Sequence, residues 1–179
     1  MLKKILIGLV ILVLAVCLGA QLLPSHWSVT RSIVINAKPA KITPLVADLK
    51  AGWPRWSSFD DEDPGIVYSY PNPKPGVGSE RAWTSKKMGN GSQRITQAND
   101  QGVGFTLDMP DYNVHLSGSL AYSPEGSATR VTWTDEGEVG RNPMQRIMMR
   151  FMDKMMGPQF EKSLAKLKEN VEAAPSAKK

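Results

Sequence analysis

The chain has 179 residues, with 22 lysines and arginines against 17 aspartates and glutamates, for a formal net charge of +5. Two lysines near each terminus contribute to this excess, and the remaining basic residues are scattered, which argues against the concentrated basic stripe of a nucleic-acid-binding protein. The single cysteine, Cys17, lies in an apolar segment, so the rest of the chain can form no disulfide, thiolate nucleophile or cysteine metal site.

Residues 5–23 contain no charged side chain and follow directly after Lys3 and Lys4. As a helix, this run spans roughly 28 Å, close to the ~30 Å hydrocarbon core of a bilayer. We therefore expect residues 1–4 to be cytoplasmic and residues 5–23 to form a transmembrane signal-anchor helix. The two lysines should stay in the cytoplasm, which in a bacterium places the C-terminal domain in the periplasm.

Two other interpretations of this segment remain open. A cleaved signal peptide usually has an apolar region of about 7–15 residues and a small-residue cleavage site. Residues 5–23 are longer than this, and the cleavage pattern is poorly met around Leu18-Gly19-Ala20. A lipoprotein-type signal is disfavoured because Val16 is large for the position before Cys17.

About 155 residues follow this segment, enough for one domain with its own core, which we place at residues 24–172. Alternating apolar residues predict a first strand over residues 27–35. A short helix is expected over residues 39–49, then a turn at 52–56 and an acidic loop at 60–64. Further strands are predicted, separated by turn residues, at 66–70, 79–87, 93–98, 103–109, 112–122 and 128–138.

The short connections between these strands favour antiparallel pairing, with Asn90-Gly91 suited to a tight hairpin. The pattern then changes to apolar residues three and four apart, which predicts an amphipathic helix beginning at Asn142-Pro143. Gly157-Pro158 should kink this helix before it continues to Val171. Residues 173–179 are expected to be a frayed tail.

The order of these elements predicts an α+β fold, in which a curved antiparallel sheet wraps around a long C-terminal helix. In this order the chain resembles the START-like superfamily, the polyketide cyclase/dehydrase and lipid transport proteins with a helix-grip fold. The resemblance covers about residues 27–171 and rests on the segments RSIVINA at 31–37, Trp53 and Trp56, Gly76-x-Gly78 with Trp83, TRVTW at 129–133, and FExxLxxLK at 160–168. Members of this superfamily bind different molecules, so the fold alone does not define the function.

Residues suited to catalysis or metal binding are scarce. His26 follows the membrane segment, and His115 has the strand parity of the polar face, so neither is expected to be catalytic. The acidic residues 60–63 lack the spacing of a calcium loop and are interpreted as a solvated loop. We predict no catalytic residue, no metal site and no cofactor.

The resemblance implies a cavity between the sheet and the C-terminal helix. Tryptophans and methionines serve equally as core residues and as walls for an apolar ligand, and both interpretations stay open. Arg81 and Asp135 share strand parity with two of the tryptophans, so they are either a polar pair inside the cavity or a surface ion pair. The candidate lining residues are Trp53, Trp56, Arg81, Trp83, Phe105, Trp133, Asp135, Met148, Phe151 and Met152.

The sequence thus favours a membrane-anchored, non-catalytic protein that holds a hydrophobic small molecule or lipid. Its expected partners are that ligand and the membrane, with no nucleic acid, and its oligomeric state is left open. One alternative is a cyclase- or dehydratase-like enzyme acting on a polyketide-like substrate. Another is a protein-interaction module of the cell envelope.

Overall fold

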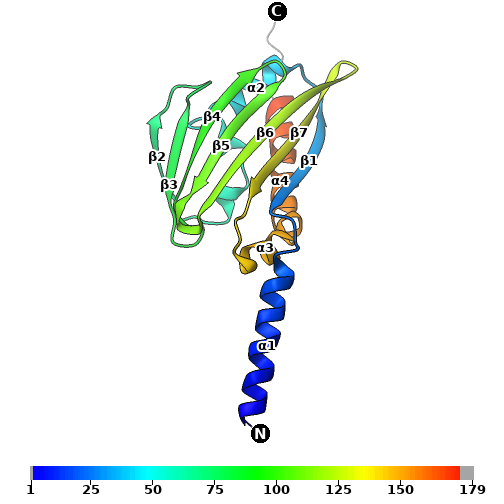
Figure 1. Cartoon of the computed structure of the whole chain (residues 1–179). Coiled ribbons are helices and arrows are strands. Elements are labelled where there is room, and N and C mark those ends of the chain that lie inside the picture. Colours follow the sequence, from blue (N-terminus) through cyan, green and yellow to red (C-terminus); the bar gives the residue numbers. More distant parts are fainter. Residues whose placement is uncertain (1, 174–179) are drawn as a thin grey trace, which may run out of the picture.

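The computed structural model describes residues 2–173, so that residues 174–179 of the expected tail lie outside the described part of the chain. The first element, α1 (Leu2–Ala20), projects away from the folded domain (Figure 1). It is long and apolar enough to cross a membrane, and nearly all of its large apolar side chains are exposed. Among the described residues it is the only helix that meets this criterion.

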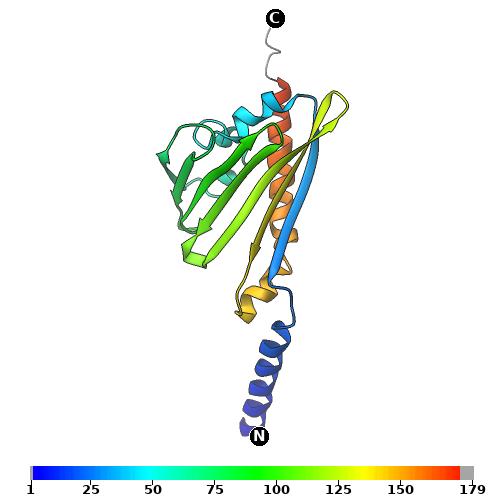
Figure 2. The same ribbon diagram turned by 45° about the horizontal axis from the view of Figure 1, so that its top comes forward.

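The domain is built on one antiparallel sheet of seven strands in the order β1-β7-β6-β5-β4-β3-β2. Strands β2 to β7 are neighbours in the order in which they occur along the chain. The first strand, β1, lies at the opposite edge from β2 and pairs with β7 along the whole length of β1. Figures 1 and 2 show the sheet curving around α4. The strands are β1 (His26–Ile35), β2 (Val67–Asn72), β3 (Glu80–Thr84), β4 (Gly91–Asn99), β5 (Gly102–Met109), β6 (Val114–Glu125) and β7 (Ala128–Glu138). This arrangement confirms the α+β helix-grip fold.

Five short helical elements and one long helix complete the domain. They are α2 (Pro39–Val46), the 3-10 turns η1 (Trp53–Arg55), η2 (Phe59–Asp61) and η3 (Pro110–Tyr112), then α3 (Pro143–Met149) and α4 (Met152–Ala173). The apolar stripe predicted for the later part of the last helix is buried against the sheet, with Phe160, Leu164, Leu167 and Val171 each at most 2% exposed. This stripe fixes α4 across the concave face.

Polar contacts hold α4 at its two sides. Arg31 on β1 donates to Asp153 and Glu161 on α4, both at 2.7 Å. On the other side, Asp61 accepts from Lys162 and Lys166, both at 2.8 Å, and these two lysines lower the pKa of Asp61 to about 2. The acidic segment predicted to be a solvated loop is therefore attached to α4 through Asp61, because two cations on that helix face it.

The last helix is interrupted at a different place from the predicted one. The N–H groups of Arg150 and Phe151 donate to carbonyls three residues back, which tightens the chain and ends α3. Helix α4 then runs from Met152 through Pro158 without a break. The residues on either side of the interruption are consequently rotated relative to one continuous helix.

Two predicted strand boundaries were also wrong. Strand β3 ends at Thr84, and residues 85–90 form a loop in which Ser85 accepts from the N–H groups of Lys87 and Met88, so no two-residue hairpin forms at Asn90-Gly91. Tyr112 belongs to η3 and is 50% exposed, because Asn113 adopts a left-handed conformation (φ 51°) that reverses the chain before β6.

Candidate functional site

A cavity of about 200 Å³ lies between the concave face of the sheet and the α3–α4 segment. Its walls are almost entirely apolar. The sheet contributes Trp83, Phe105, Leu107, Leu116 and Trp133, η1 contributes Trp53, and the helical wall consists of Met149, Met152 and Met156. Such a lining, with a few polar groups, is typical of a site for a small apolar molecule.

The deep end of the cavity is an aromatic cluster. Trp53 packs edge-on against Phe105 and Trp133, with ring centroids 5.5 and 5.9 Å apart. Phe160 on α4 stacks on Trp133 at 4.1 Å and an interplanar angle of 11°. Trp53 donates its indole N–H to the carbonyl of Val46 at 2.6 Å, which fixes the ring without using a ligand atom. The cluster thus forms a preformed hydrophobic floor.

Arg81 is the one cationic side chain in the cavity wall and is only 5% exposed. It alternates with Trp83 on β3, so both point to the concave face, and it is paired in register with Gln93 on β4. Its Nε donates to Gln93 Oε1 at 2.9 Å, and the guanidinium lies over the Trp53 ring, 4.8 Å from the centroid. Its planar cation is therefore held in one orientation by a hydrogen bond and an aromatic face.

Two buried donors beside Arg81 are not used within the protein. Among the described residues, Gln93 Nε2 and Trp83 Nε1 have no hydrogen-bond partner. Buried polar groups are normally satisfied, so these two donors favour an acceptor atom on a bound molecule or a water at this end of the cavity.

Asp135 is the buried carboxyl group of the cavity wall and is 3% exposed. It lies two residues after Trp133 on β7, on the same face, and accepts from Trp133 Nε1 at 2.8 Å. Burial raises the pKa of Asp135 from 3.8 to about 7, although the Trp133 hydrogen bond acts in the opposite direction. Its charge therefore changes near neutral pH, which is the range suited to proton transfer.

A glycine makes room for this carboxyl group. Gly118 on β6 is paired in register with Asp135, and a Cβ placed there would overlap the Phe105 ring and lie 2.5 Å from Asp135 Oδ1. A glycine has the same role on β4, where a Cβ at Gly91 would overlap the Trp83 ring. These two glycines let large side chains from neighbouring strands lie flat on the cavity wall.

Seven of the ten candidate lining residues surround this cavity: Trp53, Arg81, Trp83, Phe105, Trp133, Asp135 and Met152. Arg81 and Asp135 are both buried in its wall, so they do not form a surface ion pair. Each is hydrogen-bonded to a different neighbour, Gln93 for Arg81 and Trp133 for Asp135. Whether these seven residues bind a ligand stays a prediction.

The other three lie elsewhere. Trp56 is fully buried behind Trp53 and Trp133 and belongs to the core beneath the cavity. Met148 and Phe151 are 47% and 54% exposed and point away from the cavity. Met149 and Met156, on the same α3–α4 segment, line the cavity in their place.

Sequence reasoning missed Gln93, Gly118, Met149 and Met156. Gln93 shares strand parity with the buried Ile95, and Gly118 lies between Leu116 and Leu120 on the inward face of β6, so alternation could have placed both on the concave face. Met156 and Met149 lie four and eleven residues before the buried Phe160, so continuing the helical period backward from that residue could have found them.

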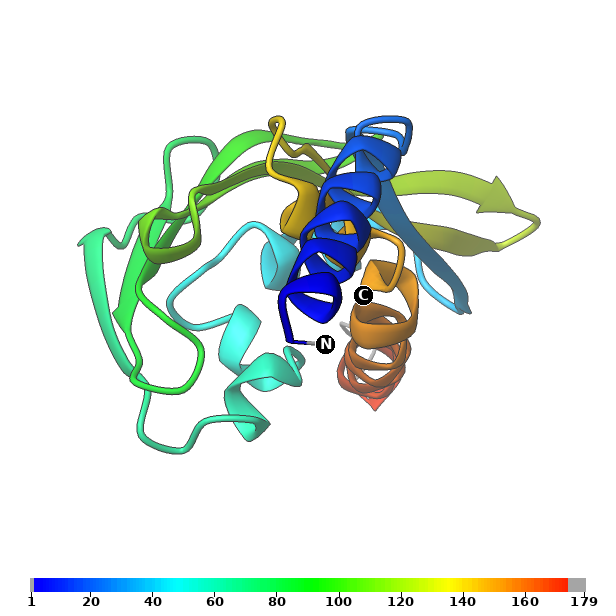
Figure 3. The same ribbon diagram turned by 60° about the horizontal axis from the view of Figure 1, so that its bottom comes forward.

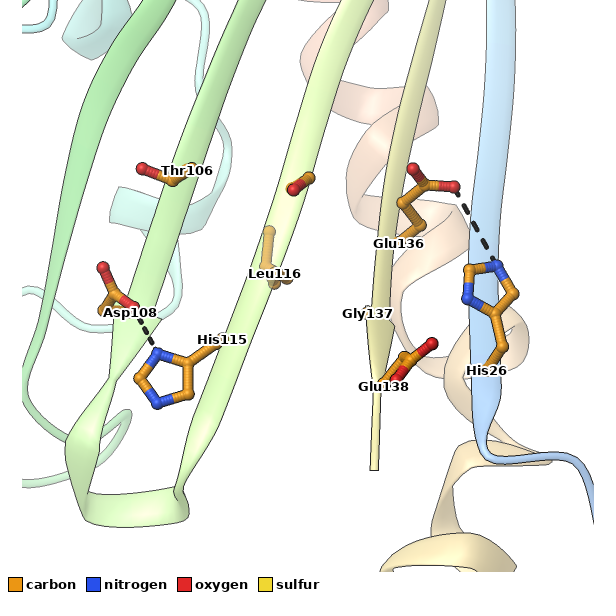
Figure 4. Close-up of a pocket in the computed structure, with 9 residues that line it drawn as sticks. His26, Thr106, Asp108, His115, Leu116, Glu136, Gly137 and Glu138 are labelled. Carbon is orange, nitrogen blue, oxygen red and sulfur yellow. Dashed lines mark hydrogen bonds and ion pairs between the residues drawn. The ribbon is translucent and has the colours of Figure 1, made fainter. Parts of the chain in front are cut away.

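A second, shallow depression lies on the convex side of the sheet (Figure 4). His115 is hydrogen-bonded to Asp108, and His26 Nε2 lies 3.9 Å from Glu136 Oε2. Both histidine side chains are more than half exposed, and the two pairs lie on separate strands without converging on one point. Within residues 2–173, no three histidine, cysteine or acidic side chains are close enough to hold a metal ion.

A curved antiparallel sheet closed by a long C-terminal helix over an apolar cavity defines a START-like, helix-grip domain. Residues 26–172 match the family described as polyketide cyclase / dehydrase and lipid transport. The chain belongs to this family, as the resemblance in its sequence predicted. A search of curated proteins finds no match.

Solved structures share this fold. The protein TTHA0849 from Thermus thermophilus is 21% identical, with a TM-score of 0.57, and the match covers 83% of this chain and 99% of that one. Norcoclaurine synthase from Thalictrum flavum, in complex with dopamine and hydroxybenzaldehyde, is 13% identical, with a TM-score of 0.60 and coverage of 88% and 92%. The di-domain ARO/CYC BexL is 20% identical, with a TM-score of 0.58 and coverage of 83% and 48%. At these identities the likeness establishes the fold alone.

Proposed function

We propose that the protein is a membrane-anchored binding protein that holds a hydrophobic small molecule or lipid between its sheet and α4. The observation that carries this proposal is the cavity itself, with apolar walls from three sides and a few buried polar groups at one end. Helix α1 supports the membrane location, since its exposed apolar side chains need a nonpolar environment. Lys3 and Lys4 favour a cytoplasmic N-terminus and a domain on the opposite side of the membrane.

The polar groups define the kind of ligand. Among the described residues, Trp83 and Gln93 supply donors that no protein atom accepts, so the ligand should carry an acceptor at this end and an apolar body elsewhere. The cavity volume, about 200 Å³, is below the ~300–1,000 Å³ of usual ligand pockets. A lipid-sized ligand therefore needs the methionine wall to move, which flexible thioether side chains allow.

Native mass spectrometry of the purified full-length chain tests this proposal. We expect a bound molecule of defined mass that is lost in Met152→Trp, which fills the cavity, and retained in Met148→Trp, which adds the same side chain on the exposed face of the same segment. Lipids held only around α1 would persist in both variants. An adduct equally retained by both variants, or no adduct in any of them, contradicts the proposal.

The alternative is an enzyme of the cyclase or dehydratase kind, and Asp135 is the observation that favours it. A buried carboxyl group with a pKa of about 7 beside an aromatic wall can donate or accept a proton near neutral pH. An enzyme would convert the bound molecule into a product of different mass or structure, and Asp135→Asn would stop that conversion while the bound substrate remained. A binding protein would release its ligand unchanged.

A further inference from the structure

Helix α3 and the first turn of α4 carry an apolar stripe on their outer face that nothing in the described chain covers. Met144, Met148, Phe151 and Met155 are 65%, 47%, 54% and 58% exposed. Met144 and Met148 are four residues apart on α3, and Phe151 and Met155 are four residues apart across the start of α4, so each pair lies on one face of its own helical turn. Large apolar side chains gathered on one helix face at this exposure indicate a surface that is covered in the working protein.

The same segment has a basic side. Arg146, Arg150 and Lys154 recur every four residues and lie next to the apolar stripe. Arg150 and Lys154 are exposed, and within residues 2–173 no carboxylate forms an ion pair with either. The one acidic residue of the segment, Asp153, is paired with Arg31. An apolar face flanked by free cations is the pattern of a helix that lies in the interface of an anionic membrane.

The position of the stripe supports a membrane as its partner. Figures 1 and 3 show α3 at the end of the domain from which α1 leaves, and the two helices are in contact. Arg146 donates to the carbonyls of Gln21 and Leu23, at 2.8 and 2.9 Å, and the Gln21 side chain donates to the carbonyl of Arg141 at 2.8 Å. These bonds hold α3 against the last residues of the apolar segment, where a membrane-spanning α1 would leave the hydrocarbon core.

We propose that this stripe docks into the headgroup region of the bilayer that α1 spans, with Arg150 and Lys154 on anionic lipid phosphates. The proposal rests on the membrane anchoring proposed above. The cavity-lining Met149, Met152 and Met156 lie on the same α3–α4 segment as the stripe. Docking of the stripe would therefore hold this wall of the cavity close to the bilayer surface.

Lipid-depth fluorescence on the full-length chain tests this docking. Single cysteines replace Met144, Met148 or Phe151 in a Cys17→Ser background, and each carries a small environment-sensitive fluorophore. The chain is reconstituted into phosphatidylcholine–phosphatidylglycerol vesicles containing nitroxide-labelled lipid. Val77→Cys is the matched control, because Val77 is 66% exposed and lies near the C-terminal end of α2, away from α1.

We expect lipid nitroxides to quench the stripe labels several-fold more than the Val77 label. The double variant Arg150→Glu, Lys154→Glu should reduce this quenching, whereas Lys41→Glu, on exposed α2, should not. Stripe labels that respond like the Val77 label, or that are shielded from both lipid nitroxide and aqueous iodide, would overturn the docking. The second result would indicate that a protein covers the stripe instead.

A label on the native Cys17 separates failure of this inference from failure of the anchor. Cys17 lies within α1, so lipid nitroxides quench its label if α1 spans the bilayer. Quenching at Cys17 without quenching at the stripe refutes only the docking. Absence of quenching at Cys17 refutes the membrane anchor, and the docking with it.

Discussion

Replacing Asp135 with asparagine should change how the stability of the domain depends on pH. In the folded protein the pKa of Asp135 is raised from 3.8 to about 7 because the carboxyl group is buried. Between about pH 4 and pH 7, the Asp135 carboxyl group therefore stays protonated in the folded state but has lost its proton in the unfolded state. The contribution of Asp135 to the free energy of unfolding is greatest below this window, falls as the pH rises through it, and stays at the lower value above about pH 7.

The size of the effect follows from the shift. At ~1.4 kcal/mol for each pKa unit, a rise from 3.8 to about 7 corresponds to at most about 4 kcal/mol. The asparagine side chain would keep an acceptor for Trp133 Nε1 but has no proton to release. We expect that Asp135→Asn does not show this decrease in the free energy of unfolding with rising pH. The variant should therefore be more stable than the wild type at about pH 8 and similar to it at about pH 4.

Denaturant unfolding of the full-length chain in detergent, followed by the emission of the buried tryptophans, measures this difference. Comparing variant with wild type cancels the contribution of the other titrating groups. Asp100→Asn, in an exposed turn, controls for the loss of one carboxylate. If the wild-type and Asp135→Asn stabilities run parallel from about pH 4 to about pH 8, Asp135 is not protonated in the folded state and the reasoning is wrong.

Three further substitutions test the packing, each by denaturant unfolding. Gly118→Ala should lower the stability by about 2 kcal/mol because its methyl group would overlap Phe105 and Asp135, whereas Gly140→Ala, with open space around it, should have little effect. Arg31→Ala should lower it by about 1–2 kcal/mol and less at high salt, since three charge-assisted bonds to Asp153 and Glu161 on α4 are lost; an unchanged midpoint would show that these bonds do not hold the helix. Ser163→Ala should cost about 1–3 kcal/mol because it leaves the buried N–H of Ser58 without its acceptor, and a loss no greater than that of the exposed Ser127→Ala would contradict this.

Strand alternation made most of the sheet side of the cavity predictable. Arg81 and Trp83 on β3, and Trp133 and Asp135 on β7, each lie two residues apart, so placing one member of a pair on the concave face places the other. The antiparallel order of the later strands followed from short turns. Pairing across strands was not predictable in the same way, and the hydrogen bond between Arg81 and Gln93 depends on register.

The glycines show a second limit of sequence reasoning. Gly118 has no side chain to enter a hydrophobic pattern, yet it determines where the Asp135 carboxyl group can lie. Its role is visible only once β6 and β7 are paired. The position of the Asp135 carboxyl group thus depends on the contact between β6 and β7. The residue pattern of a single strand does not predict that contact.

The helical wall is where the sequence pattern failed, and the physical reason bears on function. The methionine-rich segment is apolar around a large part of its circumference, so several helical phases would bury a similar area, and periodicity alone cannot choose among them. In the structure these residues are divided between the cavity (Met149, Met152 and Met156) and the outer face. A wall of flexible side chains with little preference between the two faces can move outward at small cost when a ligand enlarges the cavity. The ambiguity in the sequence and the proposed mobility of the methionine wall therefore have the same origin.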